Sequence, residues 1–218
     1  MKNQLTAIEK ELEQLPSGYL VKKRKFLYHK IGKKEVGITN DKELIRQLAR
    51  KKFLLEQRKD ITKTPKEIIN ILPNSYKDLP LSFFYHTKFH QWIDRPEIKN
   101  SYPLTTTYYS KNGTVLRSKS ELIIANSLEE YEIPYRYDNL LQLNGQKMYP
   151  DFIIKNPFTN KTIIWEHFGA LNQPDYEQRM SNKMKTYLEQ GLIPFDNLIY
   201  TFEFDLGRIN DIIEKIIL

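Results

Sequence analysis

Two acidic residues stand inside apolar runs in the second half of the chain. Asp151 lies in the run YPDFII, and Glu166 lies in the run IIWEHF. Burial of an unpaired carboxylate is costly, and two neighbouring carboxylates also repel each other. A divalent cation would relieve both costs, and oxygen ligands favour Mg²⁺ or Mn²⁺ over Zn²⁺. The pair therefore predicts a metal site; the alternative is a salt bridge to Lys or Arg, or exposure at a strand end.

A hairpin is predicted to bring the two acids side by side. Residues 147–154 and 161–168 have the apolar content of strands, and residues 156–160 (NPFTN) between them are typical of a tight turn. Neighbouring strands of a hairpin lie about 5 Å apart. We therefore expect Asp151 and Glu166 to be close in space although they are distant in sequence.

The two residues that follow Glu166 are weaker candidates for chemistry. Side chains alternate along a strand, so His167 is expected to point away from Glu166 and is not predicted to be a catalytic base. Phe168 shares the face of Glu166 but carries no group that can exchange a proton.

Glu121 is a third candidate acid, in the segment RSKSE. A helix is predicted from Ser118 to about Tyr131, and Ser118 and Glu121 have the spacing of a capping box. Capping alone would explain Glu121 and leave it off a metal ion. A ligand role and a capping role are both open from the sequence.

A lysine is predicted to reach the acids from the helix that follows Glu166. Pro174 and Gly191 mark the ends of this helix. One stripe of it carries, at helical spacing, Tyr176, Met180, Lys183 and Tyr187. The stripe is otherwise aromatic and apolar, so it should face the sheet and point Lys183 inward, whereas Lys185 lies on nearly the opposite side. The alternative is a snorkelling lysine whose stem covers apolar surface.

The remaining elements of residues 117–218 complete an α/β (α+β) unit. Strands are expected at 133–138 and 198–204, a turn at Gly145, and a final amphipathic helix at 208–218. The order α-β-β-β-α-β-α predicts a mixed sheet flanked by helices.

The first third of the chain is strongly basic. Residues 1–70 hold 18 Lys and Arg against 9 Asp and Glu, a net charge of +9, while the whole chain carries +7. Such asymmetry favours a nucleic acid as partner, because cations displace counterions from phosphates. The alternative is an ordinary solvated basic surface. The candidates for phosphate contact are Lys22, Lys23, Arg24 and Lys25.

Residues 1–72 are predicted to form a basic helix–hairpin–helix module. Helices are expected at 3–14, from Asn40 or Asp41 to about 58, and after Thr64; two strands, 19–30 and 34–38, are expected to be joined by a turn at Gly32. Residues 73–116 contain several prolines, such as Pro103, and many aromatics, such as Tyr102. We expect this segment to be an irregular connector packed against the core formed by 117–218.

The acidic residues and their surroundings resemble the core of the PD-(D/E)XK nuclease superfamily, the fold of restriction endonucleases. The resemblance covers about residues 113–204 and is carried by the blocks RSKSE, YPDF and WEHFG, then Tyr-x6-Lys-x3-Tyr. These blocks are similar to those of an uncharacterised bacterial branch. The sequence departs from the family pattern at Phe168, where a lysine normally stands two residues after the strand acid.

The resemblance implies an αβββαβ restriction-endonuclease-like core that hydrolyses phosphodiester bonds with Mg²⁺ or Mn²⁺. Asp151 and Glu166 would bind the ion with the backbone carbonyl of His167, Glu121 would assist, and Lys183 would replace the missing lysine. Phosphate contacts would come from Arg117, Lys119 and Arg179. DNA is favoured over RNA, so the expected enzyme is an (endo)deoxyribonuclease, with endonuclease or exonuclease action left open. The alternative is a catalytically inactive nuclease-like module that binds nucleic acid or a protein.

The composition limits the setting of the protein. The chain has no cysteine, which fits a reducing cytoplasm, and no apolar run of the roughly 20 residues that a membrane helix needs. We therefore expect a cytoplasmic protein without membrane contact. Whether it acts as a homodimer or with a partner protein is open from the sequence.

Overall fold

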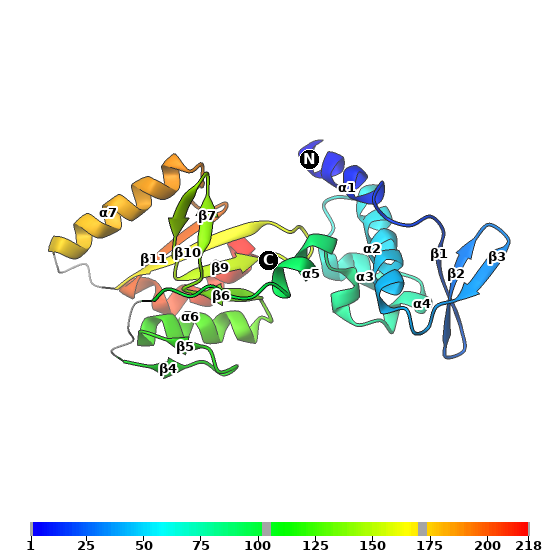
Figure 1. The fold of residues 1–218 in the computed structure, drawn as a ribbon, viewed down its shortest axis with the longest axis horizontal. Coiled ribbons are helices and arrows are strands. Elements are labelled where there is room, and N and C mark those ends of the chain that lie inside the picture. The colour runs from blue at the N-terminus through cyan, green and yellow to red at the C-terminus, as the bar shows by residue number, and fades with distance from the viewer. Residues whose placement is uncertain (1, 102–105, 170–173, 218) are drawn as a thin grey trace. The chain divides into compact units, whose positions relative to one another are not determined.

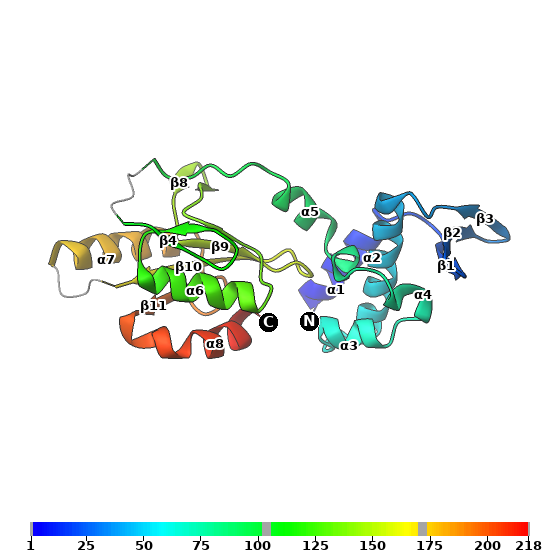
Figure 2. The same ribbon diagram turned by 90° about the horizontal axis from the view of Figure 1, so that it is seen from below.

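The computed structural model describes residues 2–101, 106–169 and 174–217. The chain forms two compact units, Met1–Ile93 and Asp94–Leu218 (Figures 1 and 2). The aromatic segment 73–116, expected as one connector, is divided between them. Its first part belongs to the N-terminal unit because Phe84 and Phe89 are buried there, with the Phe84 ring 6.4 Å from that of Phe53. Tyr102 and Pro103 lie outside the described residues.

The N-terminal unit combines helices with one antiparallel sheet of three strands. The strands are β1 Tyr19–Lys23, β2 Phe26–Ile31 and β3 Lys34–Gly37. The helices are α1 Lys2–Leu12, α2 Lys42–Lys59, α3 Pro65–Asn70, α4 Asn74–Lys77, η1 Leu81–Phe84 and α5 Thr87–Ile93.

The predicted two-stranded hairpin is wrong, because the chain reverses a second time within residues 19–30. Lys23 pairs with Phe26, so Arg24 and Lys25 form a tight turn between β1 and β2. Arg24 has a φ of 55°, a conformation that residues other than glycine, Asn or Asp rarely adopt. No residue typical of turns marks this reversal, and residues 19–30 were therefore predicted to be one long strand. The turn expected at Gly32 is present, with a φ of 58°.

Helix caps and one buried ion pair fix the helices of this unit. The Asp41 side chain accepts a hydrogen bond of 3.0 Å from the Leu44 amide and caps α2, and Thr64 opens α3 with a capping box. Arg50 of α2 is buried and makes a bidentate contact with Glu11 of α1, at 3.0 and 2.9 Å. The two Arg50–Glu11 hydrogen bonds hold α1 against α2.

The C-terminal unit is built on a mixed four-stranded sheet in the order β11-β10-β9-β6. β10 runs parallel to β11 and antiparallel to β9, which is antiparallel to β6. The strands are β6 Tyr135–Tyr137, β9 Phe152–Lys155, β10 Thr162–Phe168 and β11 Leu198–Phe202. Two small hairpins add β4 Tyr108–Tyr109 with β5 Val115–Leu116, and β7 Leu141–Leu143 with β8 Gln146–Met148.

Helices flank this sheet, as the sequence predicts for a mixed α/β unit. They are α6 Lys119–Glu130, α7 Pro174–Glu189, η2 Glu203–Arg208, α8 Ile209–Ile212 and the π-helical turn η3 Ile213–Ile217. The expected single helix at 208–218 is therefore a succession of short turns. Over residues 2–101, 106–169 and 174–217, no helix combines the length and the apolarity that a membrane span requires.

The predicted strand 147–154 is also wrong, because it is two strands with a break at Tyr149–Asp151. Pro150 has no amide hydrogen to donate to a ladder, which favours a break at this position. β8 pairs with β7 on one side of the break, and β9 joins the main sheet on the other. Asp151 is thus not inside a strand but immediately before β9, where its carbonyl accepts a hydrogen bond of 2.9 Å from the Asp138 amide.

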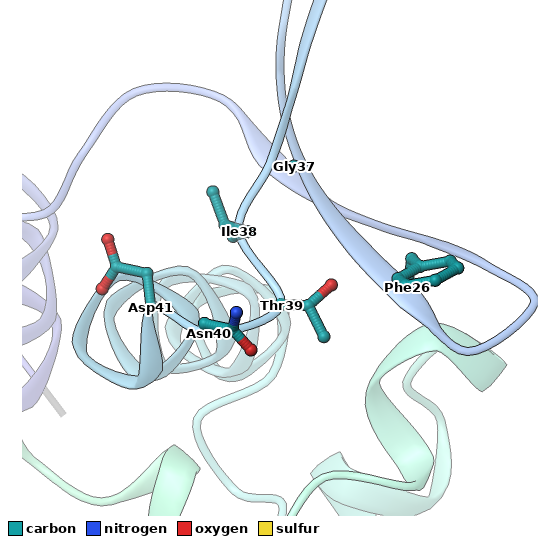
Figure 3. Close-up of a pocket in the computed structure, with 6 residues that line it drawn as sticks. All are labelled: Phe26, Gly37, Ile38, Thr39, Asn40 and Asp41. Atoms are coloured by element: carbon teal, nitrogen blue, oxygen red, sulfur yellow. The ribbon is translucent and has the colours of Figure 1, made fainter.

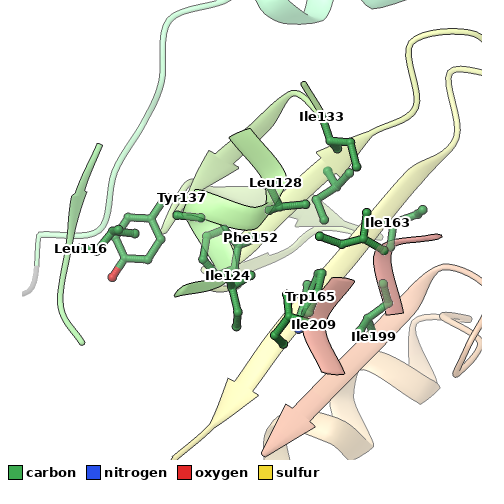
Figure 4. Close-up of a cluster of buried hydrophobic side chains, with 13 residues drawn as sticks. Leu116, Ile124, Leu128, Ile133, Tyr137, Phe152, Ile163, Trp165, Ile199 and Ile209 are labelled. Carbon is green, nitrogen blue, oxygen red and sulfur yellow. The ribbon is translucent and has the colours of Figure 1, made fainter. Parts of the chain in front are cut away.

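The core lies between α6 and one face of the sheet (Figure 4). Ile124 and Leu128 of α6 are buried against a sheet face that presents Phe152 and Trp165. Ile209 of α8 joins the same cluster. Alternation along β10 sends Glu166 to the opposite face, away from this cluster.

Candidate active site

Asp151 and Glu166 are brought together at the end of the β9–β10 pair. The last paired residues are Phe152 and Trp165, so the next residues in this register are Asp151 and Glu166. The His167 amide donates a hydrogen bond of 2.7 Å to Oδ2 of Asp151, which fixes the carboxylate at the edge of β10. The tight turn that sets this register is held by Asn156, whose Oδ1 accepts from two following amides at 3.0 Å.

Glu166 is buried and held by two side chains from α7. It is 1% exposed. Lys183 Nζ lies 2.6 Å from its Oε2, and the Tyr187 hydroxyl donates to its Oε1. Lys183 also donates to the Tyr149 carbonyl at 3.3 Å. The inward-facing lysine expected from the helical stripe therefore contacts the acid that it was expected to approach.

The protonation of this pair reflects burial and charge together. Burial, followed by the charge of Asp151, raises the pKa of Glu166 to about 8, although Lys183 and Tyr187 oppose the shift. Burial by itself would lower the pKa of Lys183, but the charges of Glu166 and Asp151 outweigh it and raise the pKa above its usual value. Lys183 is therefore a cation at neutral pH, beside an acid that gives up its proton with difficulty.

Glu121 is a capping residue that also belongs to a group of four acids, Glu121, Asp138, Asp151 and Glu166, which we call the acidic cluster. Its Oε2 accepts hydrogen bonds from the Ser118 amide at 2.8 Å, the Arg117 amide at 2.9 Å and the Tyr137 hydroxyl at 2.9 Å. Burial, followed by the charge of Asp151, raises the pKa of Glu121. The capping box expected from the sequence is confirmed, and it leaves Glu121 within the electrostatic reach of Asp151.

Asp151 is the centre of this cluster. Its charge raises the pKa of three other carboxyls, after burial in each case: Glu121, Asp138 and Glu166. Two cations oppose these four acids, Lys183 on Glu166 and Arg117 in an ion pair with Asp138. The acids outnumber these two cations, so each acid that ionises adds negative charge that a bound cation would offset.

The donor atoms fit such an ion, but the described side chains are not gathered around one. The ligands on offer are carboxylate oxygens, which suit Mg²⁺ or Mn²⁺. Within the described ranges, no three His, Asp or Glu side chains adopt a spacing that would hold a metal. Glu166 and Glu121 are instead held by hydroxyl, ammonium and amide donors. Ion binding therefore requires these carboxylates to exchange protein donors for the metal.

The predicted phosphate-binding residues of this unit differ in their surroundings. Arg117 pairs with Asp138, and its Nε is buried without a hydrogen-bond partner among the described residues. Lys119 is exposed at the first turn of α6. Arg179 is exposed and its guanidinium lies 5.8 Å from the centre of the Tyr176 ring. Arg117 alone of the three is tied to the acidic cluster by a contact described in the structure.

The His167 side chain faces away from Glu166, as alternation predicts. Its Nδ1 lies 3.1 Å from the Thr201 hydroxyl and its Nε2 lies 3.3 Å from Glu203, which also accepts a hydrogen bond of 2.6 Å from Ser120. This network belongs to the face covered by α6. His167 therefore contributes its backbone, and not its imidazole, to the acidic cluster.

The four basic residues proposed in the first third of the chain lie at the β1–β2 turn. Lys22 pairs with Asp78 and Lys23 pairs with Glu35. Arg24 and Lys25 form the turn itself. They belong to the N-terminal unit, whereas the acidic cluster belongs to the C-terminal one.

Two tyrosines that hold the carboxylates were not among the predicted site residues. Tyr187 belongs to the stripe of α7 that was predicted to face the sheet, so its helical spacing could have indicated a contact with Glu166. Tyr137 pairs with Phe152 at the end of β6. Its hydroxyl meets Glu121 only because β6 lies next to β9, which no local pattern indicates. Burial and the nearby carboxylate raise the pKa of each tyrosine, so both remain hydrogen-bond donors.

Glu166 is expected to make stability fall as pH rises. Its folded-state pKa of about 8 exceeds its usual value of 4.5, so between these pH values the folded chain binds more protons than the unfolded chain. The free energy of unfolding should then decrease with rising pH in this window. Glu166→Gln should make the decrease shallower. Urea unfolding in EDTA from pH 5 to 8, followed by tryptophan fluorescence, measures the slope of the free energy of unfolding against pH.

The control is Glu189→Gln, which alters an exposed acid of α7. Equal slopes for wild type and Glu166→Gln would contradict the expectation.

Comparison with known proteins assigns no family to the chain. No protein-family description matches it, and no solved structure matches it. A segment of 80 residues, 37% of the chain, is 34% identical to an uncharacterised protein of Methanocaldococcus jannaschii. The chain covers only 7% of the length of that protein.

Proposed function

We propose that the C-terminal unit is a divalent-metal-dependent nuclease with a restriction-endonuclease-like core, and that its substrate is DNA. The observation that carries the proposal is the position of Asp151 next to Glu166 at the end of the β9–β10 pair, with Lys183 on Glu166. The mixed sheet and the flanking helices support the same assignment. A chain without cysteine agrees with a cytoplasmic setting, where DNA is accessible.

The acidic cluster would hold the metal through Asp151 and Glu166, with Glu121 and the backbone carbonyl of His167 as further ligands. When bound, a divalent ion polarises a phosphodiester and lowers the pKa of a water molecule that it coordinates. The excess negative charge around Asp151 supports ion binding at this place. Oxygen donors alone give no reason to choose Mg²⁺ over Mn²⁺.

The remaining residues position the substrate and the charges. Lys183 stays protonated and lies next to the acids, so its ammonium can stabilise the negative charge that develops on the phosphate. Arg117, just before α6, pairs with Asp138 but keeps 31% of its side chain exposed, so its guanidinium can also donate to a phosphate oxygen. Exposed Lys119 and Arg179 would add charge for the DNA backbone.

A second candidate is a nuclease-like module that binds nucleic acid or a protein without cutting. The observation that favours it is the state of Glu166, whose two oxygens are both engaged by Lys183 and Tyr187. Phe168, which replaces the usual lysine, favours it too. This candidate predicts DNA binding that survives Asp151→Ala and Glu166→Ala, with no cleavage.

Incubation with DNA separates the two candidates. Supercoiled plasmid and linear duplex are treated with the protein in Mg²⁺, in Mn²⁺ and in EDTA. The nuclease proposal predicts nicking or linearisation that needs the metal and is lost in Asp151→Ala. Intact DNA in every metal, together with retained DNA binding, would instead support the inactive module. Cleavage that Asp151→Ala leaves intact would reject the site.

A further inference from the structure

The sheet of the N-terminal unit has one covered face and one open face. Leu20 of β1 is 2% exposed, and its amide donates to the Tyr76 hydroxyl of α4 at 3.1 Å, so the face that carries Leu20 packs against the helices. In the β1–β2 register, Tyr19 pairs with Lys30, Val21 with Tyr28, and Lys23 with Phe26. Alternation places these six residues on the opposite face.

Aromatic rings are prominent on this open face. Tyr19 and Phe26 are 49% and 48% exposed, and Tyr28 is partly exposed. Burial of an aromatic ring is strongly favourable, so exposed rings gathered on one sheet face are unusual unless something covers them. Gly37, which pairs with Tyr28, adds no side chain to the face.

Each of these rings has a lysine over it. Lys23 Nζ lies 5.4 Å from the centre of the Tyr28 ring, Lys25 Nζ lies 5.5 Å from that of Phe26, and Lys30 Nζ lies 6.0 Å from that of Tyr19. Cation–π contacts at exposed sites are weak. Lys23 and Lys30 also pair with Glu35, which lies opposite Lys30 on β3. A lysine side chain is flexible, so its ammonium can leave the ring and this carboxylate for a phosphate when a base stacks there.

A hollow adjoins the same face beside the Phe26 ring (Figure 3). Its volume is about 710 Å³. It is lined by Phe26, Gly37, Ile38, Thr39, Asn40 and Asp41. The Asn40 amide supplies both donors and an acceptor, which is the chemistry that recognises the edge of a base.

We propose that this face, made of Tyr19, Phe26 and Tyr28 with Lys23 and Lys30 and joined by Lys25 of the β1–β2 turn, is a stacking platform for single-stranded DNA. Single-stranded nucleic acid combines unpaired bases with a phosphate backbone, and it is bound by rings that stack and cations that follow the backbone. Both components alternate on this face. A duplex, whose bases are already stacked, can use only the lysines. An acidic protein would likewise use the charge and not the rings.

The platform rests on the proposed function for its purpose, since it would deliver a single strand or a DNA end to the nuclease. Its binding is nevertheless measurable without cleavage. The assay is fluorescence anisotropy of a labelled dT20 oligonucleotide in EDTA, with a 20-base-pair duplex in parallel. Wild type should bind dT20 more tightly than the duplex. With three lysines in contact, the slope of log K against log salt should be roughly −2.

Substitution of the rings tests stacking directly. Phe26→Ala should weaken dT20 binding about 5- to 150-fold, the range measured for loss of one stacked base. Phe26→Trp should retain the affinity, because tryptophan also stacks. Tyr109→Ala, which removes a ring that is 67% exposed in the other unit, is the matched control and should have no effect. Circular dichroism checks that each variant is folded.

Three outcomes would overturn the platform: equal dT20 affinity in wild type and Phe26→Ala, duplex binding as tight as dT20 binding, or polyglutamate that displaces dT20 at the same charge concentration. The nuclease proposal fails separately, through absence of metal-dependent cleavage while dT20 still binds. Cleavage that persists together with dT20 binding insensitive to Phe26→Ala would reject the platform alone.

Discussion

Asp151→Asn is expected to abolish cleavage and, at the same time, to stabilise the C-terminal unit. Loss of an essential charge at a preorganised site lowers the rate by about 100- to 1,000-fold or more. Asparagine is close in shape to aspartate and keeps an oxygen that can accept from the His167 amide. It removes the charge that raises the pKa of Glu166 and Glu121. The relief should be about 1 kcal/mol, or a Tm higher by roughly 2–4 °C.

Opposite effects on activity and stability distinguish a site from a structural ion pair. A residue that holds the fold loses both when it is changed, whereas a functional residue that sits among like charges loses activity alone. Thermal unfolding in EDTA and plasmid cleavage in Mn²⁺ measure the two effects. Asp196→Asn, which changes an exposed aspartate paired with Lys161, is the control for the substitution itself. A lower Tm for Asp151→Asn would indicate that Asp151 is structural.

Lys183→Met is expected to lower cleavage about 100- to 1,000-fold, whereas Lys185→Met should leave it unchanged. The first change removes the ammonium 2.6 Å from Glu166, and methionine fills much of the space of the lysine stem. Glu166 then loses a partner that lowers its pKa, so it holds its proton more tightly. Lys185 lies on the same helix, but its side chain is 75% exposed and only 3.8 Å from Glu189. Exposed pairs of this kind contribute little.

The two lysine variants form a matched pair, with one substitution on one helix at two different faces. Initial rates at saturating Mn²⁺ separate a role in the reaction from a role in metal binding. A lower kcat at saturating metal assigns Lys183 to the reaction. Equal rates for wild type and Lys183→Met would leave Lys183 as a structural partner of Glu166 and would favour the inactive module.

The sequence predicts those elements whose signals are local. Asp41, Thr64 and Ser118 mark the starts of three helices, because a cap needs only residues close in the chain. The tight turn at 156–160 carries its own side-chain hydrogen bonds from Asn156. The sequence does not predict the reversal at Arg24, because the turn uses a residue that rarely takes positive φ.

The strand break before β9 needed a different kind of information. Residues 147–154 are apolar enough for one strand, and a single proline is common at strand starts. The chain breaks at Pro150 because β8 pairs with β7, whereas β9 pairs with β10. Partner choice is a long-range property, and a local pattern does not contain it. The division of the aromatic segment between two units has the same origin, since Phe84 and Phe89 are buried within the first unit.

The residues of the candidate site likewise include some that local sequence predicts and some that it does not. Asp151 and Glu166 could be singled out because charged residues in apolar runs are rare and costly. Lys183 could be singled out by helical spacing. The partners of Glu121 could not, because Tyr137 reaches it through the order of β6 and β9 in the sheet. The engagement of Glu166 by Tyr187 likewise depends on how α7 packs on β10.

A titration with Mn²⁺ tests whether Asp151 and Glu166 bind one divalent ion together. Binding is followed by the loss of the electron paramagnetic resonance signal of the free ion. Wild type should bind Mn²⁺, Mg²⁺ should compete for the site, and both Asp151→Asn and Glu166→Gln should lose it, while Asp196→Asn keeps it. Affinity should increase as pH rises toward 8, because Glu166 must release its proton to become a ligand. Wild type that binds no Mn²⁺ at pH 8, or equal binding by Asp151→Asn, would contradict the metal site.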